Sequence, residues 1–458
     1  MNVTPGPRPA PFQISRRSFV KRCATVAAMT GLPLWFVERQ LRAAEEQPAA
    51  KLPTPNDRPG IALIGCGGQG SWDATNASNY GDVLAVCDVD SAHAAAAAKR
   101  FTVEGKAPPA IYSDFRKLLE RDDVHALVNG TPDHWHTLVN IAAARAKKDV
   151  YAEKPLTLTI DEGRHVIKAV RDNAVVLQTG TQQRSSTRFR LACELVRNGR
   201  LGKLLRANVW LPAGLRDGPF ATGPVPPELN WDFWQGQTPA TDYVKQRCHT
   251  FFRYWYDYSG GTMTDWGAHH NDIAYWAIGL IAPRHVESTR LAEPIPGGYT
   301  AYSEYEVRYR YANGVDLNIH TTPDDNIFGE VVNKGGQRNG IKFEGTDAWI
   351  WVNRSEITAS DPELLRAPLP ENAERLPVSN NHMGNFFDCT RTRKDPICAV
   401  EIGHRSATMC HLGAISLRTG LKLEWDSDAE RFVGDGAAEA NTYLAREMRK
   451  PYDYSFVA

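Results

Sequence analysis

The sequence predicts an α/β protein in which a doubly wound parallel sheet is followed by a second domain rich in β-strands. Three observations lead to this prediction. The chain has 458 residues, and because a domain typically takes about 150 residues, two or three domains are expected. Over residues 59–180 short apolar runs alternate with helical patterns, as in parallel sheets with right-handed crossovers. From Leu205 onward, β-rich runs become frequent.

Residues 1–44 are interpreted as a twin-arginine export signal. Ser15-Arg16-Arg17-Ser18-Phe19-Val20-Lys21 has the twin-arginine pattern and precedes the weakly apolar run CATVAAMTGLPLWF. That run is shorter than the roughly 20 residues that a membrane-spanning helix needs. We therefore expect a periplasmic or otherwise exported protein, with cleavage of the leader left open. The proline-rich, polar residues 45–58 are interpreted as a linker.

The first predicted strand and helix carry a dinucleotide-binding pattern. Ile61–Ile64 is apolar at every position, as in a central strand covered on both faces, and it ends in GCGGQG at Gly65–Gly70. A second apolar run ends at Asp88, near the expected spacing for an acid that binds ribose hydroxyls. Its carboxylate would repel a 2′-phosphate, so NAD is expected in preference to NADP. The predicted cofactor-binding residues here are Gly65, Gly67, Gly68, Gln69, Gly70 and Asp88.

The alternation continues through residue 180. Residues 91–101, 115–123 and 137–148 have helical patterns, and strands are predicted near residues 125–130, 149–155 and 174–180. Polar clusters follow three of these strands, and ligands of such sheets bind at the carboxyl ends of strands. These clusters supply Thr131, Pro132, His136, Glu153 and Lys154 as further cofactor contacts, and Gln183 and Arg184 as substrate contacts.

Residues 181–458 are assigned to the second domain. Its β-rich runs lie at residues 205–210, 302–311, 315–322 and 340–352, and Asn313-Gly314 predicts a hairpin with a primed turn. The end of the chain, residues 382–452, has a helical pattern and is expected to pack back on the first domain.

Three motifs together resemble the Gfo/Idh/MocA oxidoreductases: GCGGQG, Glu153-Lys154-Pro155, and GG-x-x-x-D-x-G-x-H-x-x-D at Gly260–Asp272. The resemblance covers about residues 57–458. It implies a Rossmann domain followed by an α/β domain with a large, mostly antiparallel open sheet. It also implies NAD(P)-dependent chemistry on sugars, cyclitols or their derivatives, and a homo-oligomer. Exported members of the family share the twin-arginine leader, and some of them keep their nicotinamide bound.

The resemblance also assigns roles to residues. Lys154 matches the lysine that contacts the reacting hydroxyl, and Glu153 matches a residue near the nicotinamide ribose. His269 matches the general base or acid, and Asp265 matches the aspartate that orients the site. Asp272, one helical turn beyond His269, is placed to hold the imidazole tautomer. The predicted substrate contacts are Gln183, Arg184, Tyr258, His270, Asp272 and His382, with packing as the alternative for each except Asp272.

The aromatic residues around 231–234 and 254–258 favour a stacked sugar ring, with core packing as the alternative. The formal net charge of zero indicates neither a nucleic acid nor an anionic membrane as partner. A small substrate that is neutral rather than polyanionic is expected, with a local basic pocket left open as the alternative. No C-x-x-C pair occurs among the eight cysteines, and no disulfide is predicted. Asp265, His269, His270 and Asp272 could instead ligate a metal, but adjacent histidines diverge on a helix, so no metal is expected.

The predicted function is that of an exported oxidoreductase that transfers a hydride between a sugar or polyol alcohol and a tightly bound NAD. Two alternatives stay open. One is a redox-assisted glycosidase or lyase on the same scaffold, and the other is a non-catalytic protein that binds NAD or a sugar.

Overall fold

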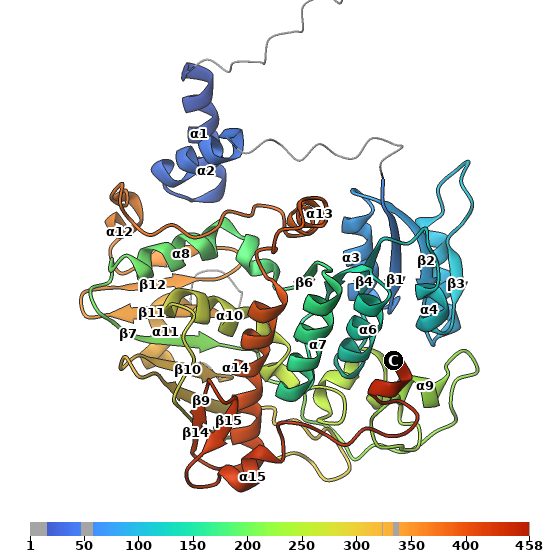
Figure 1. The fold of residues 1–458 in the computed structure, drawn as a ribbon. Coiled ribbons are helices and arrows are strands. Elements are labelled where there is room, and N and C mark those ends of the chain that lie inside the picture. The colour runs from blue at the N-terminus through green and yellow to red at the C-terminus, as the bar shows by residue number, and fades with distance from the viewer. Residues whose placement is uncertain (1–15, 47–57, 323, 333–338, 458) are drawn as a thin grey trace, which may run out of the picture.

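The computed structural model describes residues 16–46, 58–322, 324–332 and 339–457, and it contains two large sheets side by side (Figure 1). The strands of the first sheet lie within residues 60–179, and those of the second within residues 204–433. The predicted α/β fold class is confirmed by this arrangement. The predicted domain limits themselves stay predictions, and most of the predicted linker lies outside the described residues.

The first sheet is parallel throughout, with the strand order β3-β2-β1-β4-β5-β6. Its strands are β1 (Gly60–Ile64), β2 (Asp82–Cys87), β3 (Ala110–Tyr112), β4 (Ala126–Asn129), β5 (Asp149–Ala152) and β6 (Leu177–Thr179). Ile61 and Leu63 pack in the core on one face of β1, and Ala62 and Ile64 pack in the core on the other. This burial on both faces explains why the run contains no polar residue.

Five helices connect the strands of this sheet. They are α3 (Gly68–Ala77), α4 (Ser91–Phe101), α5 (Phe115–Leu119), α6 (Asp133–Arg145) and α7 (Ile160–Asn173). The sequence patterns did not predict α7, although Thr159 and Glu162 form a capping box at its start. Gly70 brings α3 close to the sheet, because a Cβ atom there would lie 2.1 Å from the carbonyl oxygen of Gly65.

The second sheet has nine strands in the order β13-β12-β11-β7-β10-β9-β8-β14-β15, and only the pair β7–β10 is parallel among the pairs described. The strands are β7 (Leu204–Trp210), β8 (His285–Arg290), β9 (Tyr305–Arg310), β10 (Asp316–His320), β11 (Gly340–Gly345), β12 (Trp349–Val352), β13 (Ile357–Ala359), β14 (Leu423–Asp426) and β15 (Arg431–Val433). The implied large, mostly antiparallel sheet is confirmed.

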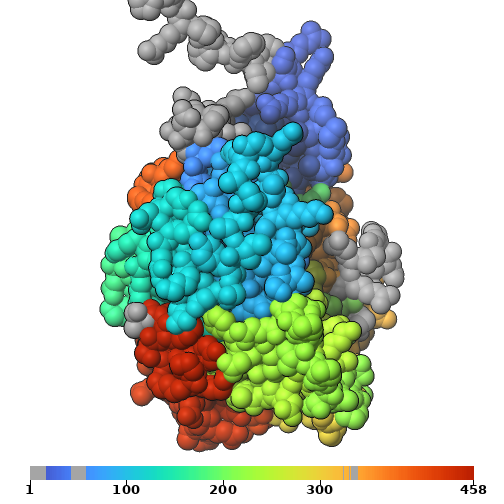
Figure 2. All heavy atoms as spheres, turned by 90° about the vertical axis from the view of Figure 1, so that its right-hand side faces the viewer, coloured from blue at the N-terminus to red at the C-terminus, as the bar shows by residue number. Residues whose placement is uncertain are grey.

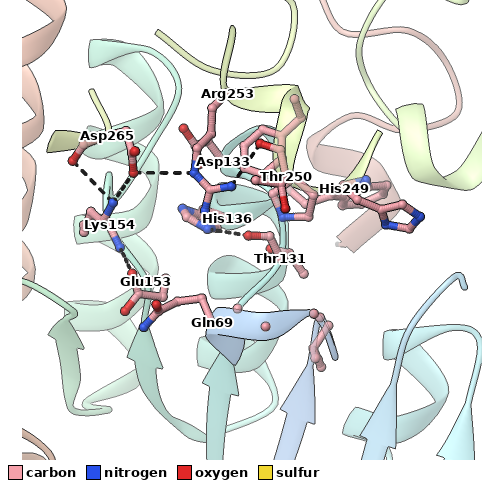
Figure 3. A pocket seen from close by; sticks show the side chains of 18 of the residues that line it. Gln69, Thr131, Asp133, His136, Glu153, Lys154, His249, Thr250, Arg253 and Asp265 are labelled. Atoms are coloured by element: carbon pink, nitrogen blue, oxygen red, sulfur yellow. Dashed lines mark hydrogen bonds and ion pairs between the residues drawn. The ribbon is translucent and has the colours of Figure 1, made fainter. Parts of the chain in front are cut away.

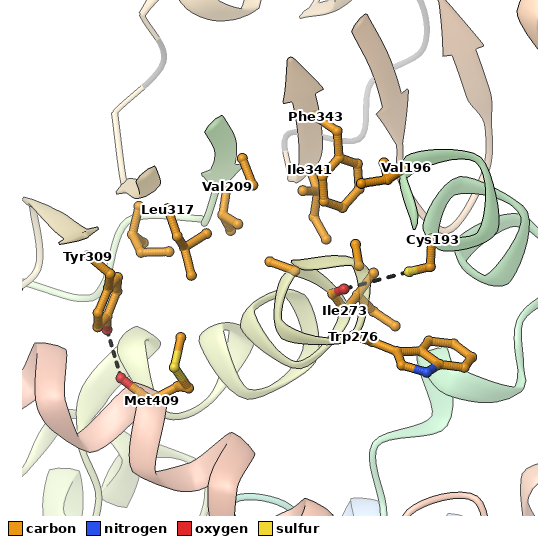
Figure 4. Close-up of a cluster of buried hydrophobic side chains, with 14 of the residues drawn as sticks. Cys193, Val196, Val209, Ile273, Trp276, Tyr309, Leu317, Ile341, Phe343 and Met409 are labelled. Atoms are coloured by element: carbon orange, nitrogen blue, oxygen red, sulfur yellow. Dashed lines mark hydrogen bonds between the residues drawn. The ribbon is translucent and has the colours of Figure 1, made fainter. Parts of the chain in front are cut away.

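Three helices cover one face of the second sheet: α8 (Thr187–Arg197), α10 (Trp266–Ile278) and α14 (Val400–Thr419). Figure 4 shows Ile273 of α10 and Cys193 of α8 lying opposite Val209, Leu317 and Phe343 of the strands. All five side chains are fully buried. This core holds α10 in place and thereby positions the motif at its N-terminus.

The hairpin between β9 and β10 differs from the predicted primed turn. Tyr311 and Val315 still pair, and the Gly314 N–H donates to the Tyr311 carbonyl at 3.0 Å, so the loop has three residues. Gly314 alone takes a positive φ, of 85°. A turn followed by one left-handed glycine replaces the two-residue turn, because the strands pair one residue further from Asn313-Gly314 than the pattern assumed.

The C-terminal region contributes side chains to the cores on both sides of the first sheet. Phe386 of α13 (His382–Thr392) joins the core on one side of the first sheet, and Val400 of α14 joins the core on the other. The region is not wholly helical, since it also supplies β14 and β15 to the second sheet. The remaining elements are short: α9 (Trp231–Gln235), α11 (Asp325–Val332), α12 (Glu363–Arg366), α15 (Ala437–Asn441), and the 3₁₀ turns η1 (Gln182–Ser185), η2 (Lys245–Arg247), η3 (His249–Tyr254), η4 (Gly261–Met263) and η5 (Tyr454–Val457).

Residues 211–259, which we call the cover segment, run from β7 across to the first domain before the chain enters α10. Ser91 donates its N–H to Glu228, and Asn230 donates to Val89, both at 2.9 Å. Figure 2 shows the segment, in yellow-green, packed below the blue first domain. Most of its aromatic residues form a cluster of their own, in which the Trp231 and Trp234 rings stack at 5.0 Å. Packing therefore accounts for most of this aromatic content.

The described part of the predicted leader forms α1 (Arg16–Thr30) and α2 (Leu34–Glu46), which lie beside α8 (Figure 1). Phe36 and Val37 are buried in the core of the second domain, and the Trp35 indole donates to the Leu365 carbonyl at 3.0 Å. None of the described helices combines the length and the apolar character needed to cross a membrane. Export of the protein stays a prediction.

Candidate active site

A cavity of about 1160 Å³ lies where the two domains meet. From the first domain it is lined by residues that directly follow β1, β2, β4 and β5, which is the edge predicted from the sequence. From the second domain it is lined by the cover segment, the start of α10 and the residue stretch after β12. The cavity therefore joins the glycine motif to the motif at Gly260–Asp272.

The glycine turn leaves an open place for phosphate groups. Gly65 has a φ of 84°, and a Cβ atom there would lie 2.5 Å from the backbone of Gly130 and Thr131. Helix α3 begins at Gly68 without any side-chain cap, and a Cβ atom at Gly67 would meet nothing within 4 Å. Because the first N–H groups of a helix lack internal partners, this uncapped end fits a pyrophosphate.

Asp88 lies at the other end of this edge and also lines the cavity. Its carboxylate accepts the Cys66 N–H at 2.7 Å and the Asp90 N–H at 2.9 Å, which orients it after β2. Burial raises the pKa of Asp88. His93 and His249 stand beside it, with ring centroids 4.6 Å apart. Sequence analysis did not single out these two histidines, which line the end of the cavity that suits an adenosine.

Asp90, His93 and His249 also have ligand atoms within 4.8 Å of one another, a spacing compatible with a metal ion. One Asp90 oxygen already caps α4 by accepting the N–H groups of Ala92 and His93. His93 and His249 line the cavity beside Asp88, whereas Asp90 is not part of the lining.

The floor of the cavity is built from the residues after β4 and β5. Glu153 is buried and accepts the Gln182 amide at 3.0 Å and the Lys154 N–H at 3.2 Å. The His136 ring lies between two carbonyl oxygens, of Pro155 at 2.6 Å and of Thr131 at 2.9 Å. Glu153, Thr131, Pro132 and His136 all line the cavity, as do Gly65, Gly67, Gly68 and Gln69, whereas Gly70 lies behind them in the helix–strand contact.

Lys154 and Asp265 meet across the domain boundary. The Lys154 ammonium donates to an Asp265 carboxylate oxygen at 2.5 Å and to its backbone oxygen at 3.3 Å. The Arg253 guanidinium lies 3.5 Å from the same carboxylate, and Figure 3 shows both cations converging on it. Burial opposes ionisation of Asp265, but the two cations hold its pKa below the usual value. The aspartate is therefore an anion that orients two donors toward the cavity.

His269 lies one turn into α10 and also lines the cavity. Burial, together with the positive charges of Lys154 and Arg354, lowers the pKa of His269 well below its usual value. Its Nδ1 atom finds no hydrogen-bond partner among the described residues. The Gln183 amide, oriented to satisfy both neighbours, donates to the His269 carbonyl at 2.9 Å and accepts from Arg354 at 3.1 Å. The imidazole is thus neutral near pH 7 and able to accept a proton.

Arg184 and Asp272 do not contact the cavity, which corrects their prediction as substrate contacts. The Arg184 guanidinium donates two hydrogen bonds of 2.7 Å to the Asp272 carboxylate, and their side chains are 2% and 0% exposed. Because Arg184 occupies both carboxylate oxygens, Asp272 does not hold the His269 ring. The pair instead ties η1 to α10, which places Gln183 beside His269.

Three further predicted substrate contacts also lie outside the cavity lining. His270 is buried and bonds to Asn339 at 3.1 Å, and Tyr258 packs in the aromatic cluster of the cover segment. His382 bonds to the Thr179 carbonyl at 2.9 Å and so joins α13 to β6. For His270, Tyr258 and His382 the structure supports packing, which was the alternative left open. Among the predicted substrate contacts, Gln183 alone lines the cavity.

Several lining residues had no signal in the sequence. Arg253, Trp266 and Arg354 come from irregular chain or from positions without a recognisable motif, and each lines the substrate side of the cavity. All eight cysteines are buried free thiols.

Two family models match the chain, and between them they cover most of it. Residues 60–181 match the model described as "Oxidoreductase family, NAD-binding Rossmann fold", and residues 218–454 match "Oxidoreductase family, C-terminal alpha/beta domain". Both models belong to the same oxidoreductase family, so the two halves of the cavity come from a known pairing of domains.

Curated relatives and solved structures are similar over parts of the chain. Levoglucosan dehydrogenase of Pseudarthrobacter phenanthrenivorans is 34% identical over 112 residues, which is 24% of this chain and 27% of that protein. A glycosyl hydrolase family 109 protein of Shewanella pealeana is 27% identical over 212 residues, which is 42% of this chain and 45% of that protein. The chain thus spans less than half the length of either relative.

The WlbA dehydrogenase from Bordetella pertussis, solved with NADH and UDP-GlcNAcA, superposes with a TM-score of 0.59 at 18% identity. The match covers 81% of this chain and 99% of that one. At this identity the likeness is one of fold.

Proposed function

The chain belongs to the Gfo/Idh/MocA family of oxidoreductases, and from this premise we propose that it is an NAD-dependent dehydrogenase acting on a secondary alcohol of a sugar or polyol. One observation carries the proposal. Lys154, Asp265 and His269 come from two domains and meet in a single cavity that continues to the glycine turn at Gly65.

Each of these side chains has a task in removing hydrogen from an alcohol. The Lys154 ammonium binds the reacting hydroxyl and stabilises the negative charge that develops on its oxygen. The neutral His269 imidazole accepts the hydroxyl proton, and Asp265 keeps the ammonium directed into the cavity. When bound, the nicotinamide supplies the acceptor for the hydride. The residues that would hold it are those of the uncapped α3 end, Asp88 and the Glu153 floor.

NAD is proposed in preference to NADP, and as a cofactor that stays bound through turnover. Asp88 favours a ribose diol and opposes a 2′-phosphate. The cover segment supports retention, because His249, Thr250 and Phe252 add lining to the cavity from the second domain. Export by the twin-arginine route fits such retention, since an exported enzyme meets little free NAD, and a second sugar or ketone would then take back the hydride. A homo-oligomer stays a prediction.

The test begins with the full chain as purified. Bound NAD is measured by absorbance and mass spectrometry, and a panel of sugars, glycosides and polyols is then added while NADH is followed. NADH formed without bond cleavage, together with a ketosugar product, is the expected result. Absence of both bound NAD and NAD binding would contradict the proposal.

A redox-assisted glycosidase is the second candidate, and the relative named as a glycosyl hydrolase family 109 protein favours it. In that case oxidation at one ring carbon is transient, an elimination follows, and the cofactor is reduced and reoxidised with no net change. Release of an aglycone without accumulation of NADH would support this candidate over the first. Bound NAD with neither product would leave only a binding function.

A further inference from the structure

Arg354 is a cation of the cavity that the proposed reaction does not use. It follows β12, its guanidinium carbon lies 4.8 Å from the centroid of the Trp266 ring, and its Nε donates to the Gln183 amide at 3.1 Å. Trp266 and Gln183 line the same cavity. Gln183 therefore holds the Nε edge of the guanidinium, and the Trp266 ring covers one of its faces, beside His269. The residue as a whole is exposed.

The two terminal nitrogens of Arg354 have no protein partner in the part of the chain that the structure describes. They donate no hydrogen bond there, and no carboxylate lies within ion-pair distance. The other two cations on this side differ, because Lys154 and Arg253 share the Asp265 carboxylate. A guanidinium fixed at Nε and over a tryptophan, with its outer nitrogens free, is set up to receive a ligand.

The three cations on this side of the cavity differ in their anionic contacts. Lys154 and Arg253 share the Asp265 carboxylate, whereas none of the described carboxylates lies within ion-pair distance of Arg354. Glu153 and Asp133 also line the cavity, but they belong to the first domain. Although the residue as a whole is exposed, partial burial of its guanidinium group lowers the pKa of Arg354, and the more distant carboxylates of Asp265 and Glu153 do not offset this effect. An anionic ligand would stabilise the arrangement.

We propose that the sugar substrate carries an oxyanion substituent, a carboxylate or a phosphate, and that Arg354 binds it while Lys154 and His269 act on a ring hydroxyl. The planar guanidinium matches two oxygens of such a group at once. The cofactor's own phosphates do not fill this role, because their place is the α3 end on the first domain, whereas Arg354 lies beside Trp266 on the second. This inference rests on the proposed dehydrogenase function and names its substrate class. It replaces the neutral substrate expected from the overall charge.

The test compares three sugars that differ only at C6: methyl glucoside, methyl glucosiduronate with a carboxylate, and methyl glucoside 6-phosphate. kcat and KM are measured for the wild type, Arg354→Gln and Arg354→Lys. The wild type should favour an anionic sugar over the neutral one. Arg354→Gln should raise KM for that sugar by on the order of 10- to 100-fold, as expected for losing a charged hydrogen bond, and leave the neutral sugar within about twofold.

Arg366→Gln is the matched control. Arg366 is on α12, is 70% exposed, pairs with Glu363, and does not line the cavity. Arg366→Gln removes the same charge from the molecule as Arg354→Gln, but outside the cavity, so KM should stay unchanged for all three sugars. Bound NAD and the melting temperature, measured for each variant, show that a loss of binding does not come from unfolding.

The outcomes distinguish a carboxylate from a phosphate on the sugar. They also distinguish failure of the inference about Arg354 from failure of the proposed dehydrogenase function. Preference for the glucosiduronate assigns a sugar acid, and preference for the phosphate assigns a sugar phosphate. A wild type that favours the neutral sugar, with Arg354→Gln unaffected, overturns the inference and leaves the dehydrogenase intact. If no sugar yields NADH, the proposed function fails, and calorimetric binding of the same three sugars to wild type and Arg354→Gln still decides the role of Arg354.

Discussion

The buried ion pair between Arg184 and Asp272 gives the sharpest test of how the motif at Gly260–Asp272 is used. Asp272→Asn keeps the shape of the side chain and removes its charge. Arg184 is only 2% exposed and has both of its described carboxylate hydrogen bonds, each of 2.7 Å, with Asp272. Its charge would be left buried and unpaired, which costs about 3–5 kcal/mol.

A loss of this size is large beside the roughly 5–15 kcal/mol by which folded proteins are stable. Thermal unfolding, followed by circular dichroism, should show a melting temperature lowered by on the order of 10 °C. Replacing both charges, as Arg184→Met together with Asp272→Leu, should recover most of the stability, because no unpaired charge then stays in the core.

Asp265→Asn is the matched comparison within the same motif. Asp265 lies at the cavity, with a side chain that is 22% exposed. Its replacement should lower hydride transfer and lower the melting temperature less than Asp272→Asn does, because the side chains of Lys154 and Asp265 keep 10% and 22% of their surface exposed. If instead Asp272→Asn left the melting temperature unchanged and raised KM, Asp272 would contact the substrate, and the structural reasoning would be refuted.

Three further predictions concern the cofactor and the chemistry. Lys154→Ala should leave NAD bound and lower kcat by about 10²–10⁴-fold, because the ammonium acts on the reacting hydroxyl. Single-turnover formation of NADH measures this effect. Unchanged turnover would remove Lys154 from the mechanism. Because the pKa of His269 lies well below its usual value, its imidazole stays neutral when the pH is lowered to about 6.5. The pH profile of kcat/KM should therefore show no inflection that depends on His269 between roughly pH 6.5 and 8. An inflection in that range that disappears in His269→Asn would contradict this prediction. Gly70→Ala should destabilise the first domain by about 1–3 kcal/mol, because its Cβ would lie 2.1 Å from the Gly65 oxygen. The control, Gly67→Ala, should keep the melting temperature and reduce NAD occupancy, since a Cβ there meets open space at the phosphate site; equal melting temperatures for the two variants would argue against close packing at Gly70.

The first sheet and the cofactor end of the site could be predicted because their signals are local. A strand such as Ile61–Ile64 is apolar at every position when both of its faces are buried, and the glycine turn must follow it directly. Asp88 is identified by its spacing from that turn. Lys154 and Glu153 follow a strand in the same way, so their place at the carboxyl edge comes from the parallel order of the sheet.

Other features could not be predicted because similar sequence signals served different purposes. The aromatic residues of the cover segment resembled a sugar platform, yet most of them pack on one another, as Trp231 and Trp234 do. Those that also line the cavity are Phe233, Trp234, Phe252 and Tyr254. Arg253 and Arg354 had no pattern, since they come from chain segments without regular periodicity and reach the cavity only after the domains meet.

Helical spacing placed Asp265, His269 and Asp272 on one stripe, but it could not assign them to the same neighbour. Asp265 precedes the first turn of α10 and faces Lys154, which is 111 residues away along the chain. Asp272 lies deeper in the helix and faces Arg184, 88 residues away. The sequence by itself determined which residues could be charged and where each lies along its helix. Only the tertiary structure decided which carboxylate stays at the cavity and which neutralises a buried cation, because a charge in the interior must find its partner across the fold.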